Sequence, residues 1–572
     1  MRKMSCIRIA GATPAILEIN INAYLNLTGI VANKIKTNNA GTEALLIFYG
    51  NTPVPPVTTY YIDPAGNDGG GHTGLIGDPW LTLSYACSRV LIPNSIIHIN
   101  AGNYIEPNRC DLARGVSIIG VGITSHIISN YVSGANEGSI HLASVAEGTL
   151  GNQVISDILL DGNALTATNG IYVGLRSNVN INNCTIQDFN WSGIFFRGSI
   201  IRYFIVNYSH DNKVSYNNII NCSTRSAPGK EGNLIISGQQ DMIINNNTFT
   251  NNVRAAGENG NLIDAVDGEF INLKIHHNNF TKAILTSAGV WDFHIEIWDC
   301  RGGVEIYNNN FYEGYQCIDT DGYTNTKGIY PYSISIHDNY FELAAPLNSL
   351  TFFDKIAINI EGNHEYVEVY KNHIKNFVWG IFVDMPPFVA APNLITNVKI
   401  YNNILQNIGY IIDWWAAGIL IQGSNVINTI EHIFIYDNVY IGGTRNYTFV
   451  YILESCNIDE IYIQNNQIQN SYFGGIIVDG AGIGALNHLY VQNNQYFNNG
   501  TDGITYPNGG SAAVLVETNN LIGNPLFVGG GNYHLTVGSP SINTGLAIAG
   551  YVTDYENIPI IDPPNIGCYE TV

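Results

Sequence analysis

The chain has 572 residues, of which 45% are apolar and only 12% are charged, whereas a typical soluble domain has roughly 25% charged residues. This composition excludes charge-driven disorder and a long charged coiled coil. The sequence contains no uninterrupted apolar run of about 18 residues, so no membrane-spanning helix is predicted. The formal net charge of −22, with only 24 Lys and Arg, excludes a nucleic-acid-binding surface built on a basic stripe.

The N-terminal region differs in pattern from the rest of the chain. Arg8 and Pro14 interrupt the first apolar stretch, so we expect no secretion signal in the sequence as given. Residues 1–52 contain short alternating segments that predict a small β adaptor or anchor. The proline-rich residues 53–59 predict an extended linker, because proline cannot donate a hydrogen bond to a β-sheet.

A repeat begins near residue 150. Its unit is apolar-x-apolar-x-x-Asn-x-apolar, as in VEIYNNNF and VKIYNNIL, and each unit also has a second segment of the type GIFVDM. Apolar residues alternate with period two in both segments, which predicts strands with one buried face, and no amphipathic helix lies between them. Neighbouring repeats are 28 to 35 residues apart, which indicates a solenoid. The aligned asparagines are Asn218, Asn247, Asn278, Asn309, Asn339, Asn372, Asn403, Asn438, Asn466 and Asn494.

Two or more strands per coil, parallel from coil to coil, predict an all-β parallel β-helix of about eleven coils. We expect the asparagines to stack in one turn column, where their amides hydrogen-bond along the stack and to the turn backbone. The β-helix with its opening segment is predicted over 60–520, and 521–572 are predicted to close it. The nine cysteines show no CxxC pair, so neither a disulfide framework nor a zinc site is expected.

The array resembles the right-handed parallel β-helix, pectin-lyase-like superfamily. The segment YYIDPAGNDGGGHTGLIGDPWLTLSYA (60–86) is similar to the opening of secreted bacterial β-helix proteins, and NPLFV, YHLTVGSPSINTG and NIGCYE resemble their closing segment. The resemblance covers about 60–572 and implies the fold. It implies function only loosely, because lyases, glycoside hydrolases, epimerases, tailspikes and non-catalytic proteins share this fold.

Carboxylates gather at the outward positions that follow the GIxV-type strands of the middle coils. Glycosidases need two carboxyl groups with separated pKa values, and like charges about one coil apart separate them. Our preferred pair is Asp299 and Asp321, with Glu361 next; a solvated acidic face and a calcium site are the alternatives, and otherwise no cofactor or metal is expected. The candidate catalytic residues are Asp299, Asp321, Glu361, Glu296, Asp319 and Asp384, and the candidate substrate-binding aromatics are Trp298, Tyr323, Trp379, Trp414 and Trp415.

A polysaccharide lyase is the weaker enzymatic reading. Such lyases usually need Lys or Arg as the base, and Lys274, Arg301, Lys327 and Lys399 have no basic cluster around them. A second outward row is aromatic: it contains His276, Tyr307, His337, Tyr370, Tyr401 and Tyr436. Stacked rings stabilise a solenoid, and this row also offers a flank for a homotrimer, which tailspike-like rods usually form.

Three classes of function follow. The first is an extracellular, tailspike-like virion appendage that binds a host surface polysaccharide and, if catalytic, cleaves it, with attachment to the virion or tail through residues 1–52. The second is a secreted bacterial polysaccharide hydrolase or lyase. The third is a non-catalytic structural β-helix. A hydrolase is favoured over a lyase if the protein is an enzyme.

Overall fold

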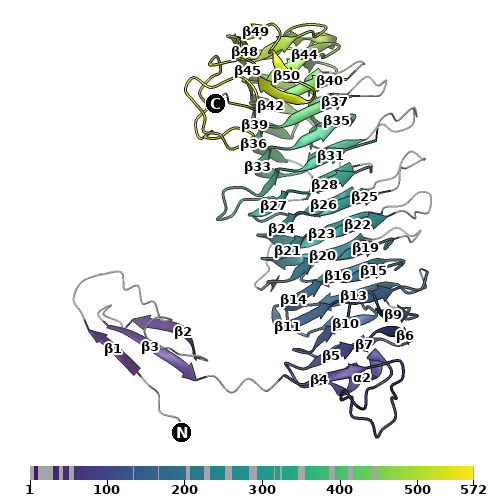
Figure 1. The fold of residues 1–572 in the computed structure, drawn as a ribbon. Helices are drawn as coiled ribbons and strands as arrows, with labels where there is room; N and C mark the ends of the chain where they lie inside the picture. Colours follow the sequence, from purple (N-terminus) through teal and green to yellow (C-terminus); the bar gives the residue numbers. More distant parts are fainter. Residues whose placement is uncertain are drawn as a thin grey trace. The chain divides into compact units, whose positions relative to one another are not determined.

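The computed structural model describes the backbone of 6–10, 30–37 and 43–50, and residues 57–570 except 133, 135, 165, 201–206, 224–231, 252–259, 283–292, 315, 323–324, 345–354, 386–392, 410–415, 444–447 and 483. The chain divides into two compact units, Met1–Thr58 and Thr59–Val572. The first unit contains a three-stranded antiparallel sheet in the order β1 (Cys6–Ala10), β3 (Glu43–Gly50), β2 (Ile30–Thr37) (Figure 1).

The second unit is a parallel β-helix with three strands in each coil, which confirms the predicted all-β solenoid (Figure 1). Its three long sheets are parallel throughout, and each is built from strands that recur once per coil. Sheet I contains β7 (Cys110–Asp111), β10 (Ile140–Ala143), β13 (Asn169–Gly174), β16 (Ser192–Arg197), β17 (Ser209–His210), β20 (Gly232–Gln240), β23 (Asn261–Ile271), β26 (Phe293–Trp298), β29 (Gln316–Asp321), β32 (Ile356–Glu361), β35 (Trp379–Met385), β38 (Ala417–Gly423), β41 (Thr448–Leu453), β44 (Gly474–Asp479) and β47 (Ile504–Thr505).

Sheets II and III complete the coils. Sheet II contains β4 (Thr59–Ile62), β5 (Ile96–Ile99), β8 (Ser117–Ile119), β11 (Thr149–Ser156), β14 (Arg176–Asn182), β18 (Lys213–Ser215), β21 (Ile243–Asn245), β24 (Lys274–His276), β27 (Val304–Tyr307), β30 (Ile334–His337), β33 (His364–Tyr370), β36 (Leu394–Tyr401), β39 (Thr429–Tyr436), β42 (Asn457–Gln464), β45 (Ala485–Gln492) and β48 (Ala512–Thr518). Sheet III contains β6 (Gly102–Glu106), β9 (Ser125–Ser129), β12 (Leu159–Asp161), β15 (Thr185–Gln187), β19 (Asn218–Ile220), β22 (Thr248–Asn251), β25 (Asn279–Lys282), β28 (Asn310–Tyr312), β31 (Tyr340–Glu342), β34 (His373–Lys375), β37 (Ile404–Ile408), β40 (Val439–Gly442), β43 (Gln467–Gln469), β46 (Gln495–Phe497) and β49 (Leu521–Ile522).

The solenoid is longer than the predicted eleven coils. Among the residues that the structure describes, sheet II has 16 strands, and sheets I and III have 15 each. The additional coils come largely from residues 59–150, which form parallel strands without the asparagine repeat on which the sequence estimate was based. Parallel crossovers of this kind are right-handed.

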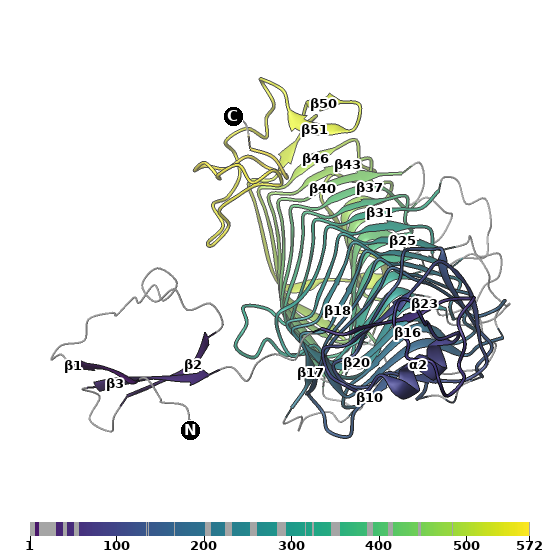
Figure 2. The same cartoon turned by 60° about the horizontal axis from the view of Figure 1, so that its bottom comes forward.

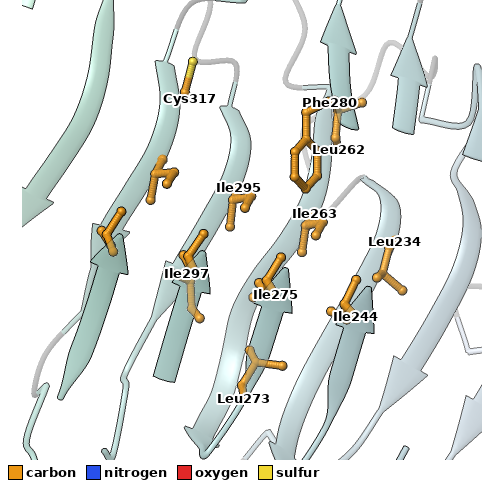
Figure 3. Packing of buried hydrophobic residues seen from close by; sticks show 14 of the residues in the cluster. Leu234, Ile244, Leu262, Ile263, Leu273, Ile275, Phe280, Ile295, Ile297 and Cys317 are labelled. Carbon is orange, nitrogen blue, oxygen red and sulfur yellow. The ribbon is translucent and has the colours of Figure 1, made fainter. Parts of the chain in front are cut away.

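The core fills the space between the three sheets. Inward residues pair along the stack, so that Ile263 lies opposite Leu234 on one side and Ile295 on the other (Figure 3). Phe280 stacks in the same way on Phe249 and Phe311. Removal of this apolar surface from water is the main stabilising contribution to such a fold.

The predicted asparagine column is confirmed, with one change of register. The Oδ1 atom of Asn309 accepts hydrogen bonds from the backbone N and from the Nδ2 of Asn278, both at 3.0 Å, and the same pattern repeats coil by coil. In the coil where Asn218 was expected, its neighbour Asn217 occupies the column, because Asn218 begins strand β19 and is exposed. The column runs through Asn217, Asn247, Asn278, Asn309, Asn339, Asn372, Asn403, Asn438, Asn466, Asn494 and Asn520.

A helix covers the first coils of the solenoid, and the C-terminal segment packs against the flank of its last coils, where Tyr533 and Cys568 contact the cluster that contains Ile404 and Val439. Helix α2 (Leu83–Arg89) buries Leu83, Ala86 and Cys87 against the first coils. At the other end are the 3₁₀ helix η1 (Pro507–Gly509) and the antiparallel pair β50 (Phe527–Gly529) and β51 (Asn532–Leu535). The chain that follows folds back along the solenoid (Figure 2), where Tyr551 donates a hydrogen bond to Asn402. No helix among the described residues is long and apolar enough to cross a membrane.

Candidate functional site

Two rows of side chains on the outer face of sheet I bring most of the predicted carboxylates together. Along β26, Ile295 and Ile297 point into the core, so Glu296 and Trp298 face outward. Each row continues on the next strands at a spacing of about 4.8 Å. Row A contains Asp264, Glu296, Asp319 and Asn359, and row B contains Trp298, Asp321, Glu361 and Asp384.

Amide side chains link these carboxyl groups. The Nδ2 of Asn359 donates to Asp319 Oδ1 and to Glu361 Oε2, at 2.8 Å in both cases, and so connects the two rows. The Nδ2 of Asn261 donates to Glu296 Oε2 at 2.6 Å. The positions of three carboxyl groups are therefore fixed by hydrogen bonds as well as by the strands that carry them.

Burial and mutual repulsion keep these carboxyl groups from ionising at their usual pH. Burial, followed by the charge of Asp264, raises the pKa of Glu296 to about 8. Burial, followed by the charges of Asp321 and Asp384, raises the pKa of Glu361 to about 8. Burial also raises the pKa of Asp319, and it raises that of Asp384 to about 7. The negative charge of Asp321 contributes to all four shifts.

Asp299 does not lie in either row, which corrects the predicted outward position and the proposed pairing with Asp321. Strand β26 ends at Trp298, and it is Trp298 that lies opposite Asp321. Asp299 follows in a left-handed turn with φ of 50° and is fully buried. Its backbone N–H donates to the carbonyl oxygen of Asp321 at 3.3 Å, so it contributes to the turn that ends the coil.

The predicted aromatic residues are distributed differently. Trp298 is half-buried within row B, next to the carboxylates. Trp379 is buried in an apolar cluster on the neighbouring coils, where its ring stacks on Phe382 at 6.0 Å. Tyr323, Trp414 and Trp415 lie outside the described residues.

The sequence reasoning missed two amides of the site. Asn261 and Asn359 lie within strands that the pattern identified only by their apolar alternation. A polar residue between two isoleucines, as in the INIEG segment around Asn359, is the signal that could have identified it.

The candidate lyase bases are engaged elsewhere. Lys274 forms an ion pair with Glu305 at 2.9 Å and Lys399 one with Glu368 at 3.3 Å, both on sheet II. Arg301 pairs with Glu269 at 2.7 Å. The ammonium group of Lys327 lies 4.0 Å from the ring centre of Tyr366. Among the residues that the structure describes, no group of three or more His, Cys, Asp or Glu could hold a metal ion.

Comparison with known proteins gives similarity to solved structures only. No protein-family model and no curated protein matches the sequence. The tailspike protein of the E. coli bacteriophage HK620, solved with a pentasaccharide, has 11% identity and a TM-score of 0.46, over 86% of this chain and 84% of that chain. The catalytic unit of a GH87 α-1,3-glucanase from Streptomyces thermodiastaticus has 12% identity and a TM-score of 0.34, over 84% of this chain and 72% of that chain. Pectate lyase Pel9A has 9% identity and a TM-score of 0.30, over 90% of this chain and 96% of that chain. Similarity at this level carries no argument about activity.

Proposed function

We propose that this protein binds a glycan across rows A and B and hydrolyses a glycosidic bond there. The observation that carries the proposal is the group of four carboxyls with raised pKa values around Asp321. Glycoside hydrolysis needs one protonated carboxyl and one ionised carboxylate near the scissile bond. Burial and like charges create that difference between neighbouring acids.

Glu361 and Asp321 are the pair that fits these roles best. Glu361 has a pKa of about 8, so it carries a proton at neutral pH, and it is half-buried and held by Asn359. It donates that proton to the glycosidic oxygen. Asp321 follows the Thr320–Ile360 pair on the neighbouring strand, and its charge acts on Glu361; it serves as the carboxylate that activates water or attacks the sugar carbon. Trp298 offers an aromatic surface beside this pair.

The charge of the protein favours an uncharged glycan. A net charge of −22 repels a polyuronate at long range, and the candidate lyase bases Lys274, Arg301 and Lys399 are held in ion pairs. Hydrolysis of a neutral or weakly charged polysaccharide is therefore favoured over lyase chemistry.

The wider role that we propose is an extracellular, tailspike-like virion appendage that acts on a host surface polysaccharide. A small β unit, Met1–Thr58, separate from the solenoid supports a role for that unit in attachment. We also propose a homotrimer. Its support is the aromatic row of sheet II, in which Tyr307 stacks on His276 and His337 at 4.8 and 5.1 Å.

The test is a cleavage assay of the full chain on a panel of neutral bacterial surface polysaccharides, read out as new reducing ends. Asp321→Asn and Glu361→Gln are each expected to lower the rate about 10²–10⁴-fold, without lowering the thermal midpoint. The matched control is Asp338→Asn, an exposed acid that follows β30 on sheet II, which should leave the rate unchanged.

Two results would contradict the proposal. Cleavage that persists in both variants would exclude rows A and B as the catalytic site. Binding of a glycan without cleavage by the unmodified protein would establish a binding-only appendage.

A further inference from the structure

A hollow of the solenoid lies away from the acidic rows, at the end of sheet III strands near the C-terminal end of the solenoid. It measures about 680 Å³ and is lined by residues that follow β37, β40, β43 and β46 or belong to their last positions. These strands succeed one another along one edge of the solenoid (Figure 2). Three strand spacings separate the first from the last, so the hollow extends over about 14 Å.

Two glycines create this hollow. The turns after sheet III carry a short row of left-handed asparagines, in which Asn407 donates to Asn376 at 3.2 Å and Asn498 donates to Asn470 at 2.8 Å. Between Asn407 and Asn470 the row is interrupted, because the intervening coil has Gly442 and Gly443 at this turn. Gly442 is required there, since a Cβ atom on it would lie 2.2 Å from the carbonyl oxygen of Asn470.

The described side chains that line the hollow are amides and hydroxyls, and none of them is charged. Asn407, Asn470 and Asn498 present amides, and none of the described residues that line the hollow is an acid or a base. Each amide has two N–H donors and an oxygen with two lone pairs. The hydrogen bond to the neighbouring asparagine of the row uses only part of this capacity. Such groups match the hydroxyls of a sugar, each of which also donates and accepts.

An exposed aromatic pair lies at the edge of the hollow. Tyr472, one of the lining residues, is 57% exposed and Phe473 is 46% exposed. Their rings are perpendicular, with centres 5.1 Å apart. The two rings together form a small exposed apolar surface, and a tyrosine combines an apolar ring face with a polar tip.

We propose that this hollow, lined by Asn407, Asn470, Asn498, Gly443 and Tyr472, is a binding site for a neutral oligosaccharide. The amides take the hydroxyl groups, and the ring of Tyr472 packs against the apolar face of a sugar. The described residues that line the hollow carry no carboxyl group, so we expect the site to bind the glycan without cleaving it. The proposal does not depend on catalysis at rows A and B.

The experiment is calorimetric titration of the full chain with maltohexaose, cellohexaose, laminarihexaose and mannohexaose, and with hexagalacturonate as the charged counterpart. At least one neutral hexasaccharide should bind saturably, and hexagalacturonate should not. Tyr472→Ala should weaken that binding tenfold or more. Tyr216→Ala is the matched control, because Tyr216 is also exposed (59%) but lies at another turn.

Gly443→Leu provides a second, independent variant. A Cβ atom at this position meets nothing closer than 3.5 Å and the backbone is not left-handed, so a side chain can enter the hollow without strain. This variant should keep the thermal midpoint and lose tenfold or more in affinity.

Three results would overturn the proposal. They are no binding of any neutral hexasaccharide, binding that both Tyr472→Ala and Gly443→Leu leave unchanged, and binding that is lost in Trp298→Ala instead. The last result would assign the ligand to the acidic rows. Asp321→Asn, which tests catalysis, should retain binding at the hollow, so the two proposals fail separately.

Discussion

The outer face of sheet I changes character halfway along the solenoid, although its backbone does not. Row A carries Asp264, Glu296, Asp319 and Asn359 on β23 to β32. The same row continues as Phe382, Leu420, Tyr451 and Ile477 on β35 to β44. Leu420, Tyr451 and Ile477 belong to a cluster of apolar side chains that is separate from the main core, and Phe382 packs against that cluster. In the part of the row on β23 to β32, Glu296 and Asp319 are carboxyls whose pKa values are raised.

The comparison shows that one backbone position can serve either stability or chemistry. Burial of an apolar side chain on this face contributes favourable free energy. Burial of a carboxyl costs free energy whenever the group must ionise, and a raised pKa is the measure of that cost. The carboxyls on β23 to β32 therefore lower stability relative to apolar side chains at the same positions, which is expected where residues serve a function.

The largest expected effect lies in the apolar half. Leu420→Ala should lower the free energy of unfolding by about 2–5 kcal/mol, because Leu420 is only 3% exposed and its removal leaves a cavity. Glu296→Gln, in the same row on the acidic half, should not lower it. Guanidinium unfolding of both variants measures the difference in the free energy of unfolding. If Leu420→Ala left this free energy unchanged, the apolar side chains on β35 to β44 would not be tightly packed.

An intermediate effect is expected at the amide that joins the two acidic rows. Asn359→Leu removes both hydrogen bonds to Asp319 and Glu361 and should lower the cleavage rate about tenfold, or roughly 1.4 kcal/mol. The amide lowers the pKa of Glu361, so its loss should move the alkaline limb of the kcat profile upward from about pH 8. A rate that falls equally at every pH would instead indicate partial unfolding.

The smallest expected effect concerns how the stability of the folded protein depends on pH. The pKa values of Glu296 and Glu361 are about 8 in the folded chain and 4.5 as the ordinary value. Between these limits the folded state binds more protons than the unfolded state, so stability decreases as the pH rises from 4.5 to 8. Glu361→Gln should reduce that slope and raise the thermal midpoint by a few degrees at pH 8, with a smaller rise at intermediate pH and none at pH 4.5. Equal slopes in the two proteins would contradict these pKa shifts.

The sequence predicted the repeat well because each coil imposes the same physical requirements. Alternating apolar residues and one turn asparagine must recur whenever a coil is added, so Asn278 and Asn309 are recognisable from spacing alone. The coils before residue 150 lack the asparagine, and they were therefore undercounted.

The site was predicted less well because spacing does not determine register. Trp298 and Asp299 are neighbours in sequence, yet the first points outward from a strand and the second is buried in a left-handed turn. A shift of one residue reverses the direction of a side chain. The role of Asn359 depends on two carboxyls from different strands, which no local pattern contains.

The C-terminal segment has a consequence for how the solenoid opens. Coils that touch only their neighbours can separate one at a time from an end. Here three hydrogen bonds, which Lys371 donates to Asn557, Tyr551 to Asn402 and Cys568 to Asn403, span 186, 149 and 165 residues. The coils beside this segment are therefore expected to open together, and a nascent chain can form these hydrogen bonds only after residues 551–568 have left the ribosome.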